Sequence, residues 1–189
     1  MQTAAALDRA DPGGTHAFKI VVTGPVGAGK TTFITTISEI ETVATEAAIS
    51  DGSGTAEKTT TTVGIDFGRL ALGAGLELYL FGTPGQQRFD FMWDIVSEGA
   101  LGVILLLDCD DPSTYPAARE MLDHFRQRVS APALVAANKV ADFDQERPRI
   151  VDALGLTEHD FVVPTDARDR TAVKQTLIEL LELVVSSMV

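Results

Sequence analysis

The chain has 189 residues, of which 45% are hydrophobic, and its 27 acidic and 15 basic residues give a net charge of −12. This length suits one domain with a sizeable core, and no apolar run reaches the ~20 residues that a membrane-spanning helix needs. The acidic balance disfavours binding to nucleic acid or to anionic lipid, because both are negatively charged themselves.

The start of the chain shows no pattern of a secretory signal. Residues 1–16 lack a basic beginning, and Asp8, Arg9 and Asp11 interrupt their apolar stretch. We expect a flexible N-terminal tail over residues 1–16 and a single domain over residues 17–189. Cys109 is the only cysteine, so no internal disulfide forms and no cysteine near the C-terminus can carry a prenyl group. These features predict a cytoplasmic protein without a direct membrane anchor.

Apolar runs typical of strands alternate with segments of helical periodicity. Strands are predicted at 18–23, 63–70, 76–81, 101–107, 134–138 and 161–163, and helices at 30–40, 89–98, 115–129, 147–154 and 171–185. This alternation predicts an α/β fold with a mostly parallel six-stranded sheet and helices on both faces. The turn Gly73-Ala74-Gly75 predicts that the second and third strands are antiparallel. Pro116 and Pro148 are expected in the first turns of their helices.

The first predicted strand and helix are joined by the pattern G-x-x-x-x-G-K-[ST], which reads Gly24-Pro25-Val26-Gly27-Ala28-Gly29-Lys30-Thr31. Glycines let backbone N–H groups turn toward one point, and the following helix N-terminus adds partial positive charge. Lys30 can reach the outer phosphates of a nucleotide, and the Thr31 hydroxyl can bind Mg²⁺. The pattern therefore predicts a nucleoside triphosphate site, a P-loop, lined by Gly24, Val26, Gly27, Ala28, Gly29, Lys30, Thr31 and Thr32.

Residues 41–62 interrupt the regular alternation. They are rich in Thr, Ala, Ser and Gly and contain Asp51-Gly52-Ser53-Gly54. A long connection without periodicity inside a compact domain is usually functional or disordered. We expect a mobile loop here, beside the terminal phosphate of the nucleotide.

Two further motifs follow in order. Thr62-Val63-Gly64-Ile65-Asp66-Phe67 comes after the irregular segment, and Gly82-Thr83-Pro84-Gly85-Gln86-Gln87-Arg88-Phe89 comes after the third strand. Together with the phosphate loop, these motifs resemble the Ras-like small GTPases, from about residue 18 to the C-terminus. Among them the chain is most similar to bacterial members, the MglA-type polarity GTPases and the GTP-binding proteins of actinobacterial conservon operons.

The resemblance implies a small G protein with a P-loop NTPase fold, which binds GTP or GDP with Mg²⁺ and acts as a switch in bacterial signalling. Thr62 would bind Mg²⁺ together with Thr31 and would meet the γ-phosphate through its peptide group. Gly85 would donate its N–H to the γ-phosphate, and Gln86 would orient the attacking water beside Lys30. Loss of the γ-phosphate would release both loops. A roadblock-type regulatory protein and a histidine-kinase-like protein are the partners that the resemblance implies.

The C-terminal half carries two motifs that resemble the base-binding loops of this family. Asn138 would join the base loop to the phosphate loop, and the stem of Lys139 would cover the base. Thr165-Asp166-Ala167-Arg168 resembles the last family motif, in which the Ala167 N–H would meet the guanine carbonyl. An ordinary loop after a strand is the alternative for this last segment.

Three positions depart from the family pattern. Gly82 stands where an acidic residue should help to hold Mg²⁺, and Asp66 is the nearest candidate to replace it. Val26 stands where animal members carry glycine, and its side chain would crowd Gln86, which predicts slow unaided hydrolysis. Ala141 stands where a carboxylate should bind guanine, so either a bulge brings Asp142 into place or selectivity between GTP and ATP is reduced.

Two other functions compete with the switch. A pseudo-GTPase scaffold is favoured by the three departures, whereas Gln86 and Thr62 favour the switch, because a scaffold needs neither. A small-molecule phosphotransferase would need a cluster of arginines for its second substrate, and the sequence shows none. Arg88 is either an internal cation for the transition state or a surface charge. The apolar cluster of Phe89, Phe91, Met92 and Trp93 is expected to face a partner in part.

Overall fold

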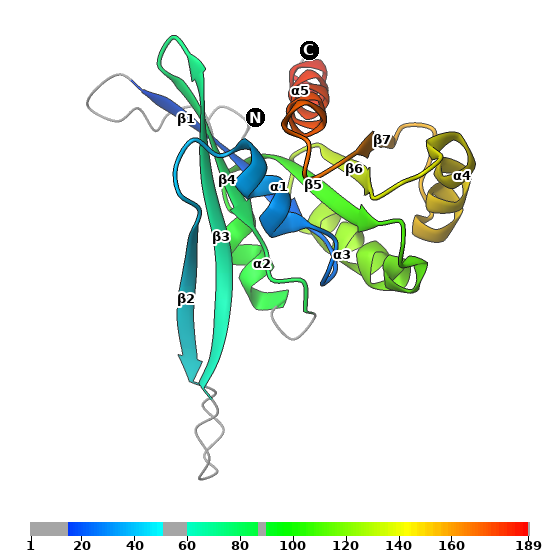
Figure 1. Ribbon diagram of the computed structural model, residues 1–189, viewed down its shortest axis with the longest axis horizontal. Helices are drawn as coiled ribbons and strands as arrows, with labels where there is room; N and C mark the ends of the chain where they lie inside the picture. The colour runs from blue at the N-terminus through cyan, green and yellow to red at the C-terminus, as the bar shows by residue number, and fades with distance from the viewer. Residues whose placement is uncertain (1–14, 51–59, 87–89, 189) are drawn as a thin grey trace.

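The sheet has seven strands in the order β2-β3-β4-β1-β5-β6-β7 (Figure 1). The computed structural model describes residues 15–50, 60–86 and 90–188, and it describes residues 43–50 and 60–63 by their backbone alone. The elements in chain order are β1 (His16–Thr23), α1 (Lys30–Ile37), β2 (Val43–Ser50), β3 (Thr60–Gly73), β4 (Leu76–Gly82), α2 (Asp90–Ser97), β5 (Ala100–Asp108), the short 3-10 helix η3 (Pro112–Thr114), α3 (Tyr115–Arg128), β6 (Ala133–Asn138), α4 (Phe143–Leu154), β7 (Phe161–Thr165) and α5 (Arg170–Ser187).

The predicted α/β fold with a mostly parallel sheet is confirmed. β1 is parallel to β4 and to β5, and β5, β6 and β7 continue as parallel neighbours. β3 is antiparallel to both β2 and β4, as the turn at Gly73 predicts. Gly73 and Gly75 have φ values of 86° and 76°, which glycine adopts easily, and Ala74 between them has a φ of 52°.

Alternate residues of the central strands point to opposite faces of the sheet and build two cores. Ile20 and Val22 of β1 belong to the core that includes Ile34 of α1 and Leu180 of α5. Val21, between them, belongs to the core that includes side chains from α2, α3 and α4. Figure 1 shows α1 in front of the sheet and α3 behind it, so the sheet is covered on both faces. This arrangement explains why the β5 sequence is apolar without alternation.

The structure corrects three expectations drawn from the sequence. Residues 43–50 and 60–62 are not a loop, because they form β2 and the beginning of β3, which pair along their length; residues 51–59 lie outside the described part. Pro148 lies inside α4 rather than in its first turn, because Asp142 caps the helix and Phe143 begins it. His16 already belongs to β1, while the rest of the predicted tail, apart from Thr15, lies outside the described residues.

The parallel strands place their carboxyl ends at one edge of the sheet, and loops that are distant in the sequence meet there. The loop after β1 holds the phosphate motif, Asn138 ends β6 and Lys139 begins the loop after it, and the loop after β7 holds Ala167. Ligands of open α/β sheets bind at this edge. Within the described ranges, no helix is both long and apolar enough to cross a membrane.

Candidate functional site

The phosphate loop has the backbone conformation that its glycines allow. Gly24, Gly27 and Gly29 have φ values of 143°, 85° and 100°. A Cβ on Gly24 would lie 2.2 Å from the carbonyl oxygen of Leu106, so only glycine fits against β5 at this point. Gly29 is the N-cap of α1, and the loop therefore leads directly into a helix N-terminus, where anions bind well.

Lys30 folds back over this loop. Its Nζ donates hydrogen bonds to the carbonyl oxygens of Gly24 at 2.8 Å and Pro25 at 2.7 Å, and only 9% of the residue is exposed. Burial lowers the pKa of Lys30 to about 8, and the nearby Asp66 carboxylate opposes that shift. The ammonium group is thus buried beside the phosphate loop, with two carbonyl oxygens as hydrogen-bond partners and the Asp66 carboxylate nearby.

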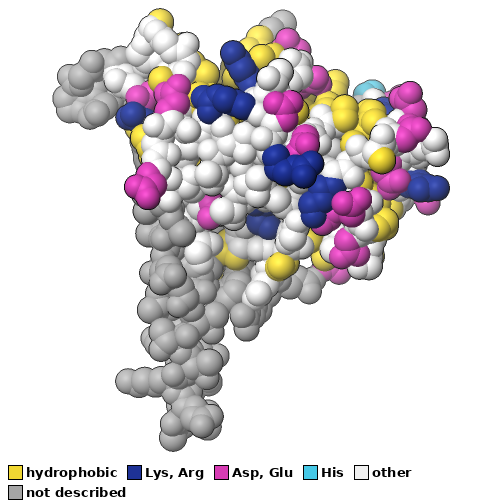
Figure 2. All heavy atoms as spheres, in the orientation of Figure 1, with side chains coloured by type: hydrophobic (Ala, Val, Ile, Leu, Met, Phe, Trp, Pro, Cys, Tyr) yellow, Lys and Arg dark blue, Asp and Glu magenta, His cyan; other side chains and the backbone are white. Residues whose placement is uncertain are grey.

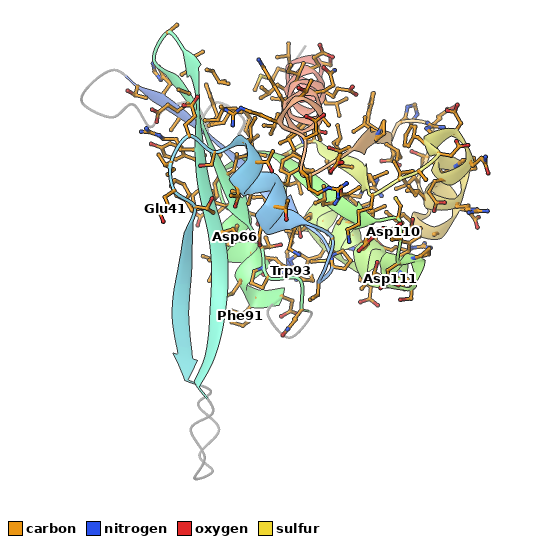
Figure 3. All side chains as sticks on the ribbon, viewed as in Figure 1. Glu41, Asp66, Phe91, Trp93, Asp110 and Asp111 are labelled. Carbon is orange, nitrogen blue, oxygen red and sulfur yellow. The ribbon has the colours of Figure 1, made fainter. Side chains whose placement is uncertain are left out.

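Thr31 and Asp66 meet beside Lys30. Asp66, which is labelled in Figure 3, accepts a hydrogen bond from the Thr31 hydroxyl at Oδ2, at 2.5 Å, and this bond joins the beginning of α1 to β3. Asp66 lies directly across the strand pair from Gly82 of β4. A Cβ on Gly82 would approach both the Asp66 Cβ and the Ile34 Cδ1 to 3.0 Å, so the missing side chain at Gly82 leaves the room that Asp66 occupies. The hydroxyl and carboxylate oxygens are ligands that suit Mg²⁺.

The segment after β4 also reaches the phosphate loop. A Cβ on Gly85 would lie 2.6 Å from the backbone nitrogen of Val26 and 2.9 Å from Lys30 Nζ, so the Gly85 backbone packs against the loop. Gln86 is exposed, as is Val26 at 61%, and the described contacts do not join the two side chains. The crowding predicted for this pair stays a prediction.

Some of the predicted residues are placed only in part. The backbone of Thr62 pairs with Ala48 of β2, and its side chain lies outside the description. Arg88 and Phe89 lie outside the described residues altogether. Thr32 is exposed on the first turn of α1. The expected contacts of Thr62 with Mg²⁺ and γ-phosphate therefore stay predictions.

Asn138 connects the loops on the other side of the site. Its Nδ2 donates to the carbonyl oxygen of Ala28 at 2.9 Å, and its Oδ1 accepts from the Ala167 N–H at 3.0 Å. Lys139 Nζ donates to the Gly27 carbonyl at 3.3 Å and pairs with Asp108 Oδ2 at 2.5 Å. The bond from Asn138 to the phosphate loop is the link expected from the sequence. The ion pair of Lys139 with Asp108 was not predicted from the sequence.

The expected base contacts are less complete. The Asp142 carboxylate caps α4, where it accepts from the Gln145 backbone N–H at 3.2 Å and from the Gln145 side chain at 2.5 Å. The Ala167 N–H, expected to meet a guanine carbonyl, donates to Asn138 Oδ1.

On the face drawn in Figure 2, basic and acidic side chains lie next to one another near its middle.

The helix after Gln86 presents part of its apolar surface to solvent. Met92 and Trp93 are buried, and Trp93 Nε1 donates to the carbonyl oxygen of Pro84 at 3.1 Å. Phe91, which is labelled in Figure 3, is 45% exposed, and Ile95, four residues later on the same helix, is 66% exposed. The cluster expected from the sequence is thus divided between core and surface, and Ile95 joins its exposed part.

A metal site made of protein side chains alone is not evident. Across residues 15–50, 60–86 and 90–188, no group of three or more His, Cys, Asp or Glu side chains is placed to hold a metal ion. Thr31 and Asp66 offer two oxygen ligands, which fits the way Mg²⁺ binds between a protein and the phosphates of a nucleotide.

Comparison with known proteins identifies the class that this fold and site define. The family model described as "Conserved hypothetical ATP binding protein" matches residues 38–188, and the chain belongs to this family. The match begins after the phosphate loop. The assignment therefore depends on the sheet, the later loops and the C-terminal helix rather than on the glycine motif.

Individual relatives support the Ras-like small GTPase superfamily. The Ras-related protein RAB1BV of Beta vulgaris is 28% identical over 145 residues, which are 74% of this chain and 61% of the relative. The Ras-related protein Rab-3C of Mus musculus is 25% identical over 193 aligned positions, which are 96% of this chain and 77% of the relative. The uncharacterized protein MJ1339 of Methanocaldococcus jannaschii is 32% identical over 90 residues, about half of either chain. Nucleotide binding is the function that the description of the matched family names, and the phosphate loop is a motif that fits it.

Proposed function

We propose that this protein is a GTP-binding switch that hydrolyses GTP slowly without a partner. The observation that carries the proposal is the position of Lys30. The ammonium group is buried against two carbonyl oxygens of the phosphate loop, with the Asp66 carboxylate nearby, and a polyphosphate bound at this loop would add favourable charge to it. Beside it lie the Thr31–Asp66 pair and the Gly85 backbone, so groups for phosphate, metal and phosphate sensing come together from three segments.

Each of these groups has a role in the proposed reaction. The loop N–H groups and Lys30 bind the β- and γ-phosphates, and Gly85 offers an N–H to the γ-phosphate. Gln86 orients a water whose oxygen forms a bond to the γ-phosphorus while the bond to the bridging oxygen breaks, which yields GDP and inorganic phosphate. Thr31 and Asp66 would hold Mg²⁺, which neutralises phosphate charge when it is bound.

The exposed surface of α2 supports a partner at the switch. Phe91 and Ile95 follow Gln86 closely in the sequence, and their exposed apolar side chains lie four residues apart on one helix, where a partner could cover both. We assign this surface to a roadblock-type regulator that acts on the second switch segment, with a histidine-kinase-like protein in the same bacterial signalling system. The family resemblance, rather than a contact in the structure, supports both partners.

Identification of the nucleotide tests the proposal most directly. The protein is purified without added nucleotide, its bound ligand is released by denaturation, and chromatography identifies that ligand. Calorimetric titration with GTP and Mg²⁺ then compares the wild type with Lys30→Ala and with Lys174→Ala, which removes an exposed lysine on α5. Loss of a charge-assisted phosphate contact should weaken binding roughly 10- to 100-fold in the first variant only. Equal affinity in all three proteins would contradict the assignment.

The role of Asp66 has its own test. Asp66→Asn should reduce the gain in GTP affinity that Mg²⁺ provides, because the amide offers a weaker metal ligand than the carboxylate. Asp152→Asn, a change of the same kind at an exposed position of α4, is the matched control. An unchanged Mg²⁺ dependence in Asp66→Asn would remove Asp66 from the metal site.

A pseudo-GTPase scaffold is the second candidate, and Ala141 is the observation that favours it. The residue offers no acceptor to a base, and its neighbour Asp142 is engaged as a helix cap. A scaffold would bind nucleotide without turnover, so measurement of phosphate release in a single turnover separates it from the switch.

A further inference from the structure

The base side of the proposed site lacks a carboxylate at the expected place. Guanine presents two neighbouring donors, its N1–H and its N2 amino group, and a carboxylate is the group that accepts from both. Ala141 has no acceptor, and both Asp142 oxygens accept hydrogen bonds from Gln145 at the beginning of α4. Asp108 is paired with Lys139, and only 9% of its side chain is exposed, so it is less accessible to a base. If the base is read by a carboxylate, a different segment has to supply it.

Asp166 lies in the loop that Asn138 fastens to the phosphate loop. Thr165, just before it, is the partner of Asn138 in the parallel pair of β6 and β7. Ala167, just after it, donates its N–H to Asn138 Oδ1. The backbone of Asp166 is therefore fixed from both sides next to the residue that links both loops. Its position depends on buried hydrogen bonds, while its own side chain remains 44% exposed.

The Asp166 carboxylate is already arranged to accept two parallel hydrogen bonds. Arg168 donates to Oδ1 from its Nε at 3.0 Å and to Oδ2 from its Nη2 at 3.0 Å, and the Arg168 backbone N–H also donates to Oδ1 at 2.9 Å. These contacts with Arg168 hold the pKa of Asp166 at about 2, so the group is anionic at neutral pH. Two donors side by side are also what the edge of guanine presents.

Arg168 can give way to a ligand at little cost. Its side chain is 79% exposed, and exposed ion pairs of this kind contribute little to stability. The backbone N–H of Arg168 stays in place when the guanidinium turns away, so the carboxylate keeps one fixed hydrogen bond that orients it. A base could therefore replace the guanidinium without a change in the fold.

We propose that Asp166 is the residue that selects guanine, by accepting hydrogen bonds from N1–H and the N2 amino group in place of the Arg168 guanidinium. Adenine has a lone pair at N1 and no amino group at C2, so it would meet the carboxylate with repulsion. The inference rests on the proposed function, because it requires a nucleotide bound at the phosphate loop. With Asp166 as the acceptor, neither of the two alternatives drawn from Ala141 is needed, which were a bulge that moves Asp142 into place and a reduced selectivity between GTP and ATP.

Competition binding in the full chain tests this role. The wild type and Asp166→Asn are titrated with GTP, ATP and XTP, whose xanthine carries a carbonyl at C2 in place of the amino group. We expect the wild type to prefer GTP over ATP. Asp166→Asn should lose roughly 10- to 100-fold in GTP affinity and gain affinity for XTP, because the new amide can donate to the C2 carbonyl. A purely structural role for Asp166 would lower the affinity for all three nucleotides alike.

Asp142→Asn is the matched control for the same titrations. It keeps an oxygen that can cap α4, so it should leave both the fold and the ratio of GTP to XTP affinity unchanged. A change of base preference in Asp142→Asn instead of Asp166→Asn overturns the inference, as does equal binding of GTP and ATP by the wild type; the proposed phosphate site survives both results. Absence of binding to any of the three nucleotides would refute the proposed function itself, and the inference with it.

Discussion

Replacing Asn138 by alanine tests the architecture of the site most stringently, because this side chain joins two of its loops. The Asn138 side chain is 3% exposed and joins them by donating to the Ala28 carbonyl and accepting from the Ala167 N–H. Asn138→Ala leaves both groups unpaired, and Ala28 and Ala167 are 0% and 2% exposed. A buried polar group without a partner costs about 1–3 kcal/mol, so the two together should lower the free energy of unfolding by about 2–6 kcal/mol.

Urea unfolding of the nucleotide-free protein measures this loss. The midpoint should fall while the slope of the transition stays the same, since the area exposed on unfolding hardly changes. Gln175→Ala, which removes an exposed amide on α5, should remain within about 0.5 kcal/mol of the wild type. Hydrogen exchange gives a local readout, because the Ala167 amide should lose its protection. A loss below about 1 kcal/mol with the Ala167 amide still protected would refute the bridging role of Asn138.

Three other predictions concern the phosphate side. Because the pKa of Lys30 is lowered from 10.5 to about 8, the folded state binds fewer protons than the unfolded state between these values. The stability of the wild type relative to Lys30→Met should therefore rise by about 3 kcal/mol as the pH increases from 8 to 10.5, measured by urea unfolding at each pH. Gly85→Ala should displace the segment that accepts the Trp93 hydrogen bond, because its Cβ would lie 2.6 Å from a backbone nitrogen. Since Trp93 is the only tryptophan, a shift in its fluorescence without nucleotide checks this, and an unchanged spectrum argues against the contact. Gly82→Asp should destabilise the fold because its Cβ would crowd Asp66, whereas the double change Asp66→Gly with Gly82→Asp should restore Mg²⁺-dependent binding, as titration with and without Mg²⁺ would show.

The sequence predicts those elements whose side chains carry a strong local signal. β5 is recognisable because both of its faces are buried, and the phosphate loop because its conformation requires glycines. β2 is not recognisable in this way. It is an edge strand with the sequence VATEAAIS, which contains few of the large apolar residues that mark a buried face. Its pairing with β3 supplies hydrogen bonds through the backbone, and backbone hydrogen bonds leave little trace in the sequence.

Asp142, at the beginning of α4, is an acidic residue that the sequence allows to be interpreted in two ways. Asp142 invites interpretation as a displaced base-binding residue, because it follows Asn138 and Lys139. The same residue stands three positions before Gln145, with Asp144 and Glu146 in the first helical turn, which is the pattern of an N-cap. The hydrogen bonds to Gln145 show that the cap is formed. Local capping thus explains the acidic residue without any reference to the nucleotide.

The candidate metal ligand shows how a contact between strands can preserve a site while its sequence motif changes. Directly opposite residues of an antiparallel pair place their Cβ atoms about 5 Å apart, so an acidic side chain can move from one strand to its neighbour and still reach the same region. Asp66 and Gly82 are such a pair, and the Asp66 carboxylate reaches Thr31 at the beginning of α1. Position in the sequence suggested Asp66 only as the nearest acid. The register of β3 against β4 explains why Asp66 can take this place. Asp66 lies directly opposite Gly82, and a side chain at Gly82 would clash with it.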